Sequence, residues 1–289
     1  MISIVLCVYN EENNIKDCLE SLKNQSYKDF ELIIVNDGST DNTMKIVRDY
    51  EKEFKMKIID TKHVGLRRAR NLGISRAIGE IIVTIDADEI LDSKCIKYLV
   101  ESFKDKKAGT VGGYIRSYRD NWIAKGSNSL KDLFYSKRDW TAGGCAAYKR
   151  ELLEKLKLSE EKIGADVDIS WKIKERGYTV KIDKRAVVYH KDPQNISGVV
   201  MREYKIGRRS LKTFFAHKKY FDLRFWSRFF QLFILILLII NWKAAISFFF
   251  IYFALILAIL KSHRIYAFII LNFMNIGWSL GVLVSVFKK

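Results

Sequence analysis

The chain has 289 residues, 49% of them hydrophobic, which is enough for one sizeable domain and a smaller second part. Its 50 lysines and arginines exceed its 33 aspartates and glutamates, and the net charge of +17 favours anionic partners such as nucleic acid, nucleotide phosphates or acidic lipid headgroups. Cys7, Cys18, Cys95 and Cys145 lie far apart and form no C-x-x-C pair. This spacing argues against a zinc knuckle or a disulfide framework and favours a reducing compartment.

Residues 1 to about 200 alternate short β-branched runs with segments of helical period, the pattern of parallel βαβ units. The expected strands are Ile2–Val8, Leu32–Val35, Lys57–Asp60, Ile81–Ile85, Val111–Ser117, Cys145–Tyr148, Val180–Ile182 and Ala186–Tyr189. The expected helices are Asn13–Asn24, Asp41–Glu51 with Asp41 as its N-cap, Leu66–Ala77, Cys95–Phe103 and Asp166–Glu175. The pattern predicts an α/β domain whose first half is Rossmann-like. The N-terminal run has no basic region before it, so we expect a strand and not a signal peptide.

The C-terminal third differs from the rest of the chain. Residues 201–228 are basic and aromatic, and three apolar runs follow, Phe229–Ile240, Ala244–Leu260 and Ile265–Phe287. Two of the runs predict transmembrane helices and the first predicts a third span or an interfacial segment. We interpret residues 201–228 as an amphipathic juxtamembrane connector that contacts anionic lipid. A solvated linker helix and a nucleic-acid arm are the alternatives, and the adjoining apolar runs argue against nucleic acid.

Polar residues follow three of the expected strands. Tyr9 and two glutamates follow the first strand, Asp37 and a glycine turn follow the second, and Asp86 and Asp88 follow the fourth. Ligands of open α/β sheets bind beyond the carboxyl ends of the strands, so these clusters should meet at one site.

The pair Asp86 and Asp88 has the spacing that directs two carboxylates to the same side of an extended backbone. Such oxygens suit Mg²⁺ or Mn²⁺, which also binds substrate phosphates, so the pair indicates a diphosphate ligand. An acidic loop that caps the following helix is the alternative. Asp37 and the Tyr9 ring are candidates to hold a nucleoside, although the N-D-G-S stretch is also a common turn.

Several ordered motifs closely resemble the family 2 glycosyltransferases with the GT-A fold. They are Ser3-Ile-Val-Leu-Cys-Val-Tyr-Asn-Glu-Glu-Asn-Asn-Ile, Asp29-Phe-Glu-Leu-Ile-Ile-Val-Asn-Asp-Gly-Ser-Thr-Asp, Ala69-Arg-Asn-Leu-Gly and Asp86-Ala-Asp. The resemblance covers residues 1 to about 190. It implies a mixed sheet flanked by helices and a metal-dependent hexosyltransferase, to which the apolar runs add a membrane anchor.

The resemblance also implies roles for single residues. Tyr9, Asp37 and Asp86 would contact the nucleoside of the donor, Cys7 would contact the donor through its backbone, and Asp88 would bind the metal. Arg70 would lie near the phosphates or fix its loop, or else be a surface partner on a helix. His190 is a candidate third metal ligand, with a structural histidine as the alternative. His63 receives no role.

In the second half, the segment Gly164-Ala-Asp-Val-Asp-Ile-Ser-Trp resembles the family's acidic motif at the start of a late helix. Asp166 inherits the role of general base by position, and Ala165 replaces the usual glutamate. An N-terminal helix charge is the alternative for Asp166. Gly143 and Gly144 would approach the donor sugar and the acceptor, or form an ordinary connection. Asp168 and Trp171 are acceptor-region candidates, although Asp168 could face water and Trp171 could be a buried helix residue.

The sequence therefore predicts three parts: a GT-A domain over residues 1–200, the connector over 201–228 and a membrane region over 229–289. The expected reaction is inverting sugar transfer from a nucleoside diphosphate sugar to a lipid-linked or glycan acceptor, with Mg²⁺ or Mn²⁺ and without nucleic acid. The expected location is the cell membrane, with the catalytic domain cytoplasmic. The alternatives are a processive polysaccharide synthase, although no Gln-x-x-Arg-Trp stretch appears in the connector, and a non-catalytic nucleotide-binding membrane protein.

Overall fold

The computed structural model describes residues 1–135, 139–158, 165–193, 195–216, 233, 241–259 and 264–287. The chain divides into two compact units. The first contains Met1–Arg116 and Arg138–Lys191, and the second contains Ser117–Lys137 and Asp192–Lys289. The second unit thus includes residues 117–137 and 192–200, which lie within the range 1–200 predicted for the first domain.

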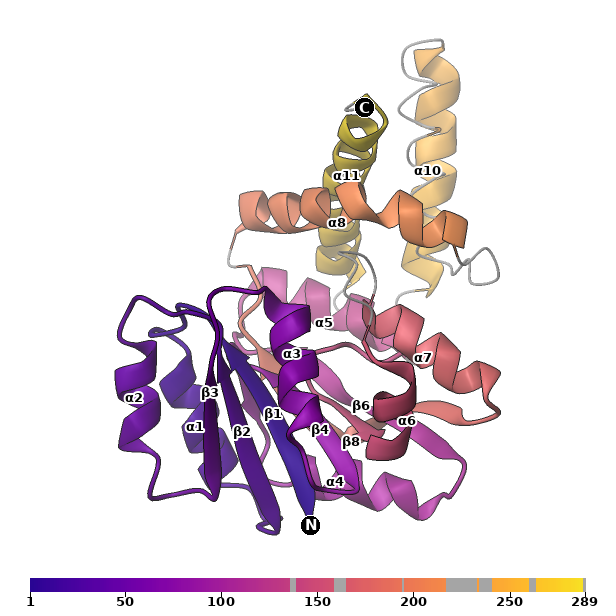
Figure 1. The fold of residues 1–289 in the computed structure, drawn as a ribbon. Coiled ribbons are helices and arrows are strands. Elements are labelled where there is room, and N and C mark those ends of the chain that lie inside the picture. The colour runs from indigo at the N-terminus through magenta and orange to yellow at the C-terminus, as the bar shows by residue number, and fades with distance from the viewer. Residues whose placement is uncertain are drawn as a thin grey trace. The chain divides into compact units, whose positions relative to one another are not determined.

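The first unit is built on a mixed sheet (Figure 1). Among the described residues the strands are β1 (Ile2–Val8), β2 (Phe30–Asn36), β3 (Met56–Asp60), β4 (Ile81–Asp86), β5 (Glu89–Leu91), β6 (Ala108–Ser117), β7 (Ala146–Lys149) and β8 (Thr179–His190). They form one eight-stranded sheet in the order β3-β2-β1-β4-β7-β6-β8-β5. This arrangement confirms the predicted mixed α/β fold.

Strands β1 to β4 are parallel to one another, as the βαβ pattern predicts, whereas β7 is antiparallel to both β4 and β6. Two details differ from the expected strands. Val180–Ile182 and Ala186–Tyr189 belong to one continuous strand, β8, and the short strand β5 pairs with its end. The three-residue β5 is too short to show a periodic signal in the sequence.

The helices of this unit connect the strands. They are α1 (Ile15–Lys23), α2 (Thr43–Asp49), α3 (Leu66–Ser75), α4 (Cys95–Glu101), α6 (Arg150–Leu156) and α7 (Ala165–Glu175), with a 3₁₀ turn over Ser102–Lys104. Helix α6 was not predicted from the sequence. The predicted N-cap of α2, Asp41, is wrong by one residue, because Asn42 occupies that position. The Asp41 carboxylate still accepts the backbone N–H of Thr43 at 3.0 Å, so it orders the turn that precedes the helix.

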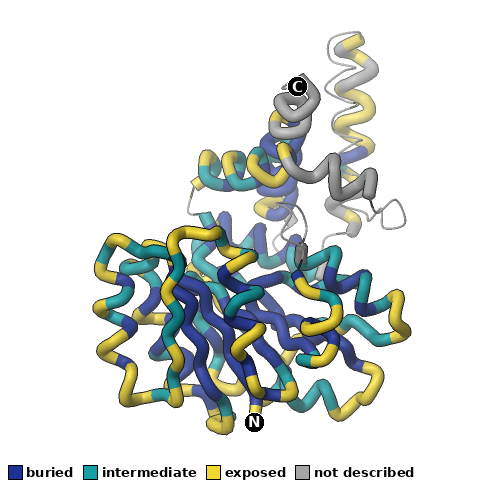
Figure 2. The backbone as a smooth tube through the Cα atoms, in the orientation of Figure 1, coloured by how far each residue is buried: buried dark blue, intermediate teal, exposed yellow. Residues whose placement is uncertain are grey.

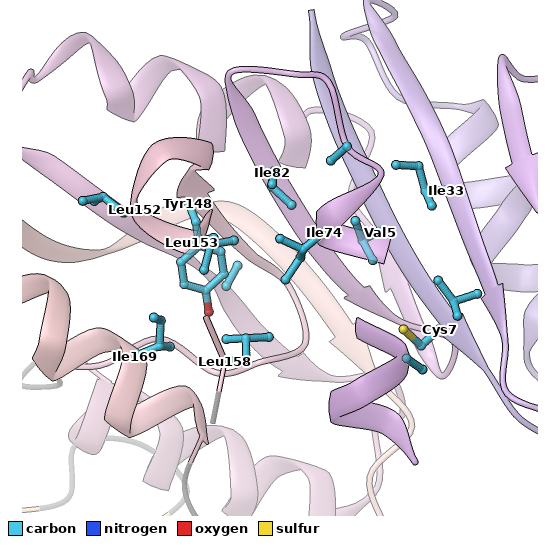
Figure 3. Packing of buried hydrophobic residues seen from close by; sticks show 14 of the residues in the cluster. Val5, Cys7, Ile33, Ile74, Ile82, Tyr148, Leu152, Leu153, Leu158 and Ile169 are labelled. Atoms are coloured by element: carbon cyan, nitrogen blue, oxygen red, sulfur yellow. The ribbon is translucent and has the colours of Figure 1, made fainter. Parts of the chain in front are cut away.

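One face of the sheet carries a continuous hydrophobic core (Figures 2 and 3). Val5, Ile33 and Ile82 project from three neighbouring strands toward the helices that cover this face. Those helices are α3, α6 and α7, which contribute Ala69, Ile74, Leu152, Leu153, Ile169 and Ile173. Because side chains alternate along a strand, one set of apolar residues packs here while the next set faces the opposite side. The core therefore anchors the helices that carry Arg70 and Asp166.

The second unit is helical, with α5 (Trp122–Tyr135), α8 (Ile196–Ala216), α10 (Trp242–Ile259) and α11 (Arg264–Phe287) among its described residues. Glycines let these helices approach closely. A Cβ at Gly207 of α8 would lie 2.1 Å from the carbonyl oxygen of Trp278 in α11. A Cβ at Gly126 of α5 would lie 2.6 Å from the carbonyl oxygen of Tyr266. Buried Asp192 links two helices, since it pairs with Lys131 of α5 at 2.5 Å and Arg202 of α8 at 2.8 Å.

The membrane predictions fall in this unit. Within the described ranges, no helix combines the length and the apolar character needed to cross a membrane. The predicted span Phe229–Ile240, except Phe233, lies outside the described residues, as does the connector after residue 216. The first part of the predicted connector forms α8.

Candidate active site

The residues that follow β1, β2 and β4 meet at one end of the sheet. The parallel registers place Cys7 beside Asp86 and Val8 beside Asn36, so the three strands end at nearly the same level. A cleft of about 400 Å³ opens there. Its lining residues are Cys7, Val8, Tyr9, Glu11, Asp37, His63, Leu66, Asp86, Ala87 and Asp88. The structure therefore brings together five of the predicted site residues, namely Cys7, Tyr9, Asp37, Asp86 and Asp88.

Asp37 is buried at the wall of this cleft and organises the segment before α3. Its carboxylate accepts hydrogen bonds from the Thr61 hydroxyl at 2.6 Å and from the backbone N–H groups of Val64 at 2.6 Å and Gly65 at 2.9 Å. Gly65 has a φ of 91°, a conformation that favours glycine. Asp37 thus shapes the cleft through its loop, and its predicted contact with a nucleoside stays a prediction.

Tyr9 and His63 form an aromatic pair at the cleft, with ring centroids 4.1 Å apart and an angle of 37° between the ring planes. Both side chains are exposed, Tyr9 to 44% and the His63 side chain to 59%. His63 lies at a φ of 54° and its Nδ1 is 3.2 Å from the carbonyl oxygen of Asp37. His63 received no role from the sequence, because a lone histidine is more often structural, and only the fold brings it against Tyr9.

Arg70 is buried beneath the cleft, at 5% exposure, so the interpretation as a surface partner is wrong. Its Nη2 donates to Oδ1 of Asp86 at 2.5 Å. Burial alone would lower the pKa of Arg70, but the negative charges of Asp86 and Asp166 outweigh it and raise the pKa further. Arg70 is therefore a permanent positive charge that contacts Asp86 and acts electrostatically on Asp166. Burial also raises the pKa of the neighbouring Cys7 thiol to about 12, so this thiol is neutral.

Asp166 stands in the first turn of α7, where the sequence predicts the general base. Desolvation raises the pKa of Asp166, Arg70 lowers it, and Asp86 raises it again, with a net rise. The backbone N–H of Gly143 donates to the carboxylate, and a Cβ at Gly143 would lie 2.2 Å from Oδ1. A carboxylate with a raised pKa is a stronger base than an ordinary aspartate, which is the property that proton abstraction requires.

The buried hydroxyl groups of Ser170, Thr141 and Tyr148 form a chain of contacts that ends at the backbone of Asp166. Ser170 donates to the carbonyl oxygen of Asp166 at 2.7 Å and accepts the backbone N–H of Thr141 at 3.1 Å. The Thr141 hydroxyl lies 3.3 Å from the Tyr148 hydroxyl, which points away from the strand toward the helices in Figure 3. These contacts tie the first turn of α7 to the end of the sheet.

Glu89 is a further acidic residue of the site that the sequence analysis did not select. Its buried carboxylate accepts the backbone N–H of Asp86 at 3.1 Å and that of Cys145 at 3.3 Å. A Cβ at Gly144 would lie 2.2 Å from Oε1. Desolvation and the charge of Asp86 raise the pKa of Glu89. In the sequence, the position of Glu89 directly after Asp86-Ala-Asp88 could have identified it as a site residue. Its contact with Cys145 arises only in the fold.

Asp88 and His190 form the candidate metal site, with Oδ2 of Asp88 3.3 Å from Nε2 of His190. The pairing of β5 with the end of β8 brings them together, since Glu89 is opposite His190. One carboxylate and one imidazole fit a divalent ion that takes its remaining ligands from diphosphate and water. Among the described residues, no group of three or more protein ligands could hold a metal.

The four acceptor-region candidates divide into two pairs. Gly143 and Gly144 lie against the carboxylates of Asp166 and Glu89. Asp168 instead lies 2.7 Å from Lys172 one helical turn later. Trp171 is buried at 6% exposure, and its predicted place in the acceptor region stays a prediction. Glu11 is a cleft residue that sequence reasoning did not select, although it follows β1 directly.

A mixed sheet with an acidic cleft after β1, β2 and β4 defines a glycosyltransferase fold of the GT-A class. Residues 3–157, more than half of the chain, match the family described as Glycosyl transferase family 2, and the chain belongs to this family. A poly-beta-1,6-N-acetyl-D-glucosamine synthase of Staphylococcus epidermidis is 30% identical over 215 residues, which are 68% of this chain and 52% of the synthase. The chain thus spans about half the length of this relative.

Two solved structures share the fold. The mannosyltransferase PcManGT from Pyrobaculum calidifontis, in complex with GDP-Man and Mn²⁺, has a TM-score of 0.69 and 21% identity, covering 99% of this chain and 87% of its own. S. aureus TarS 1-349, in complex with UDP-GlcNAc, has a TM-score of 0.56 and 18% identity, covering 95% of this chain and 89% of its own. At these identities the likeness concerns the fold alone.

Proposed function

We propose that this protein transfers a sugar, with inversion, from a nucleoside diphosphate sugar to a hydroxyl group of an acceptor. One observation carries the proposal: the buried Arg70 guanidinium donates to Asp86 of the cleft, and its charge also acts on Asp166, a carboxylate whose pKa is raised. In this proposal the cleft holds the donor, and Asp166 is the group that deprotonates the acceptor. Family membership supports the same reaction class.

In the proposed reaction, Asp166 accepts the proton of the acceptor hydroxyl, whose oxygen then attacks the anomeric carbon of the donor. The bond between that carbon and the diphosphate oxygen breaks on the opposite face, so the configuration inverts. Mg²⁺ or Mn²⁺, held by Asp88 and His190, would neutralise the charge that develops on the leaving diphosphate. Tyr9 and His63 offer their rings to the nucleobase.

UDP-GlcNAc is the first donor to test, because TarS is described in complex with it and the synthase makes an N-acetylglucosamine polymer. GDP-Man, the ligand of PcManGT, is the second. The assay measures nucleoside diphosphate released by membranes that contain the protein, across UDP-, GDP- and dTDP-sugars with Mg²⁺ or Mn²⁺. We expect one donor to be consumed, and Asp88→Asn to abolish its consumption. No consumption of any donor, with nucleotide still bound, would favour the non-catalytic binding protein.

We further propose a lipid-linked acceptor at the cytoplasmic face of a membrane, reached through the basic connector and the two or three C-terminal spans. The apolar runs of residues 229–289 and the nine basic residues of the connector support this proposal. Labelled sugar should then enter the organic phase after extraction. Label found only in free sugar or soluble protein would contradict it.

A processive polysaccharide synthase is the second candidate, and the similarity to the poly-beta-1,6-N-acetyl-D-glucosamine synthase favours it. The length of the product on a gel separates the two. A ladder of long chains supports the synthase, and a single added sugar supports the lipid-directed transferase.

A further inference from the structure

The segment Gly143–Cys145 lies between the two acidic parts of the site. On one side the backbone N–H of Gly143 donates to Asp166, and on the other the backbone N–H of Cys145 donates to Glu89. Glu89 also accepts the N–H of Asp86, so one carboxylate holds both the segment and the strand end that carries Asp86. The position of this segment therefore sets the position of Asp166 relative to Asp86.

Thr84, near the end of β4, contacts the backbone of the same segment through its hydroxyl group. The pairing of β4 with β7 ends at Thr84 and Ala146, and the chain before Ala146 leaves this ladder. The Thr84 hydroxyl lies 3.1 Å from the carbonyl oxygens of both Gly143 and Gly144, and 3.3 Å from that of Ala146. Its one hydrogen is shared among these buried acceptors at the point where backbone pairing stops.

The two glycines leave no free space beside their neighbours. A Cβ at Gly143 would lie 2.2 Å from Oδ1 of Asp166, and a Cβ at Gly144 would lie 2.2 Å from Oε1 of Glu89. Each carboxylate thus packs directly against a glycine backbone. A small shift of the segment must therefore move a carboxylate.

We infer that Thr84 and Glu89 are positioning residues, which hold the Gly143–Cys145 segment so that Asp166 faces the reacting centre. The inference rests on the proposed transfer reaction, in which Asp166 is the base. Neither residue needs to touch the substrate. Their effect should therefore appear in the rate of the bound complex and not in donor binding, since misplacement of a catalytic group by about 1 Å can cost about 100-fold.

The test uses the full chain and the donor that the unmodified protein consumes. Thr84→Val keeps the shape of the side chain and removes only the hydroxyl. We expect kcat to fall about 10- to 100-fold, with the KM for the donor changed by less than about 2-fold, and Thr84→Ser to restore most of kcat. The melting temperature of each variant reports folding separately.

A second variant changes the segment itself, at the glycine that packs against Glu89. Gly144→Ala should reproduce the loss of kcat, because its Cβ meets Glu89. An unchanged kcat in Thr84→Val, or a loss that appears equally in donor KM, overturns the inference. Absence of turnover by the unmodified chain instead rejects the proposed function, and the inference with it.

Discussion

Nη2 of Arg70 in α3 lies 2.5 Å from Oδ1 of Asp86 at the end of β4, although the two residues are 16 positions apart in the sequence. The contact places a buried positive charge beside the cleft. The same charge lowers the pKa of Asp166, whose net shift is still upward because desolvation dominates. Arg70 therefore controls both the carboxylate expected to contact the donor and the expected base.

Replacing Arg70 by glutamine should shift the pH dependence of turnover. Without the positive charge the pKa of Asp166 rises further, so at a given pH less of the base is deprotonated. The acidic limb of the kcat profile should therefore move to higher pH. The measurement is kcat between pH 5 and 9, a range of about four units around neutrality. Arg76→Gln, an exposed arginine at the end of the same helix, is the control and should leave the limb in place.

An acidic limb that stays in place in Arg70→Gln would show that Asp166 is not the group that controls the rate. In that case the Arg70–Asp86 contact serves donor binding alone, and the KM for the donor should rise instead.

The sheet, and the edge of the sheet where the site forms, could be predicted because both leave patterns in short stretches of the sequence. The β-branched runs of β1, β2 and β4 mark buried parallel strands, and Tyr9, Asp37 and Asp86 stand at or directly after their ends. Because parallel strands end at one edge, their convergence follows from the topology alone.

The contacts that tune the site could not be predicted in this way, because they join residues distant in sequence. Thr141 and Ser170 are 29 positions apart, and Glu89 and Cys145 are 56 apart. No periodic pattern records such pairs. Asp37 shows the same limit, since its three bonds to the segment before α3 depend on a loop whose conformation the sequence does not reveal.

Removal of either candidate metal ligand should weaken metal binding in the presence of nucleotide. We expect Asp88→Asn and His190→Gln each to reduce the affinity for Mn²⁺ about 10- to 100-fold, because each variant removes one side of the 3.3 Å pair. Electron paramagnetic resonance of free Mn²⁺, titrated with protein and UDP, measures this directly. Asp29→Asn, exposed just before β2 at the far end of the sheet, is the acidic control. Equal affinities in all four proteins would reject the pair as a metal site.

Loss of the aromatic pair should weaken nucleotide binding, because stacking with the base is lost while the contacts with the diphosphate remain. The centroids of Tyr9 and His63 are 4.1 Å apart, too close for a base to fit between the rings, so the base must stack on an outer face of the pair. Tyr9→Ala and His63→Ala should each cost about 1 kcal/mol in binding of UDP or GDP, whereas His63→Phe should retain most of the affinity. Isothermal titration calorimetry provides the measurement.

Inorganic pyrophosphate is the matched ligand for this experiment, because it has the diphosphate and lacks the base. Its affinity should be the same in the unmodified protein and in Tyr9→Ala. A parallel loss of pyrophosphate binding would mean that the substitution disturbs the phosphate site, and that the rings are not a base platform.

Glu31 offers a test of stability that leaves the site untouched. Its fully buried carboxylate accepts the Ser3 hydroxyl at 2.6 Å and the N–H of Ile78 at 2.9 Å, and pairs with Lys57 at 3.0 Å. Burial raises the pKa of Glu31, but these bonds outweigh it and the net shift is downward. Glu31→Gln should therefore destabilise the folded protein by about 1 to 3 kcal/mol at neutral pH.

The pH dependence of this effect has a definite sign. Since the pKa of Glu31 is lower in the folded protein than its ordinary 4.5, the stabilisation is complete above that value and is lost as the pH falls through the folded pKa. The difference in melting temperature between Glu31→Gln and the unmodified protein should therefore be largest near pH 7 and shrink in acid. Glu51→Gln, which removes an exposed pair with Arg48, should change the melting temperature little at either pH. A difference that grows in acid would mean that the ionised form of Glu31 does not stabilise the fold.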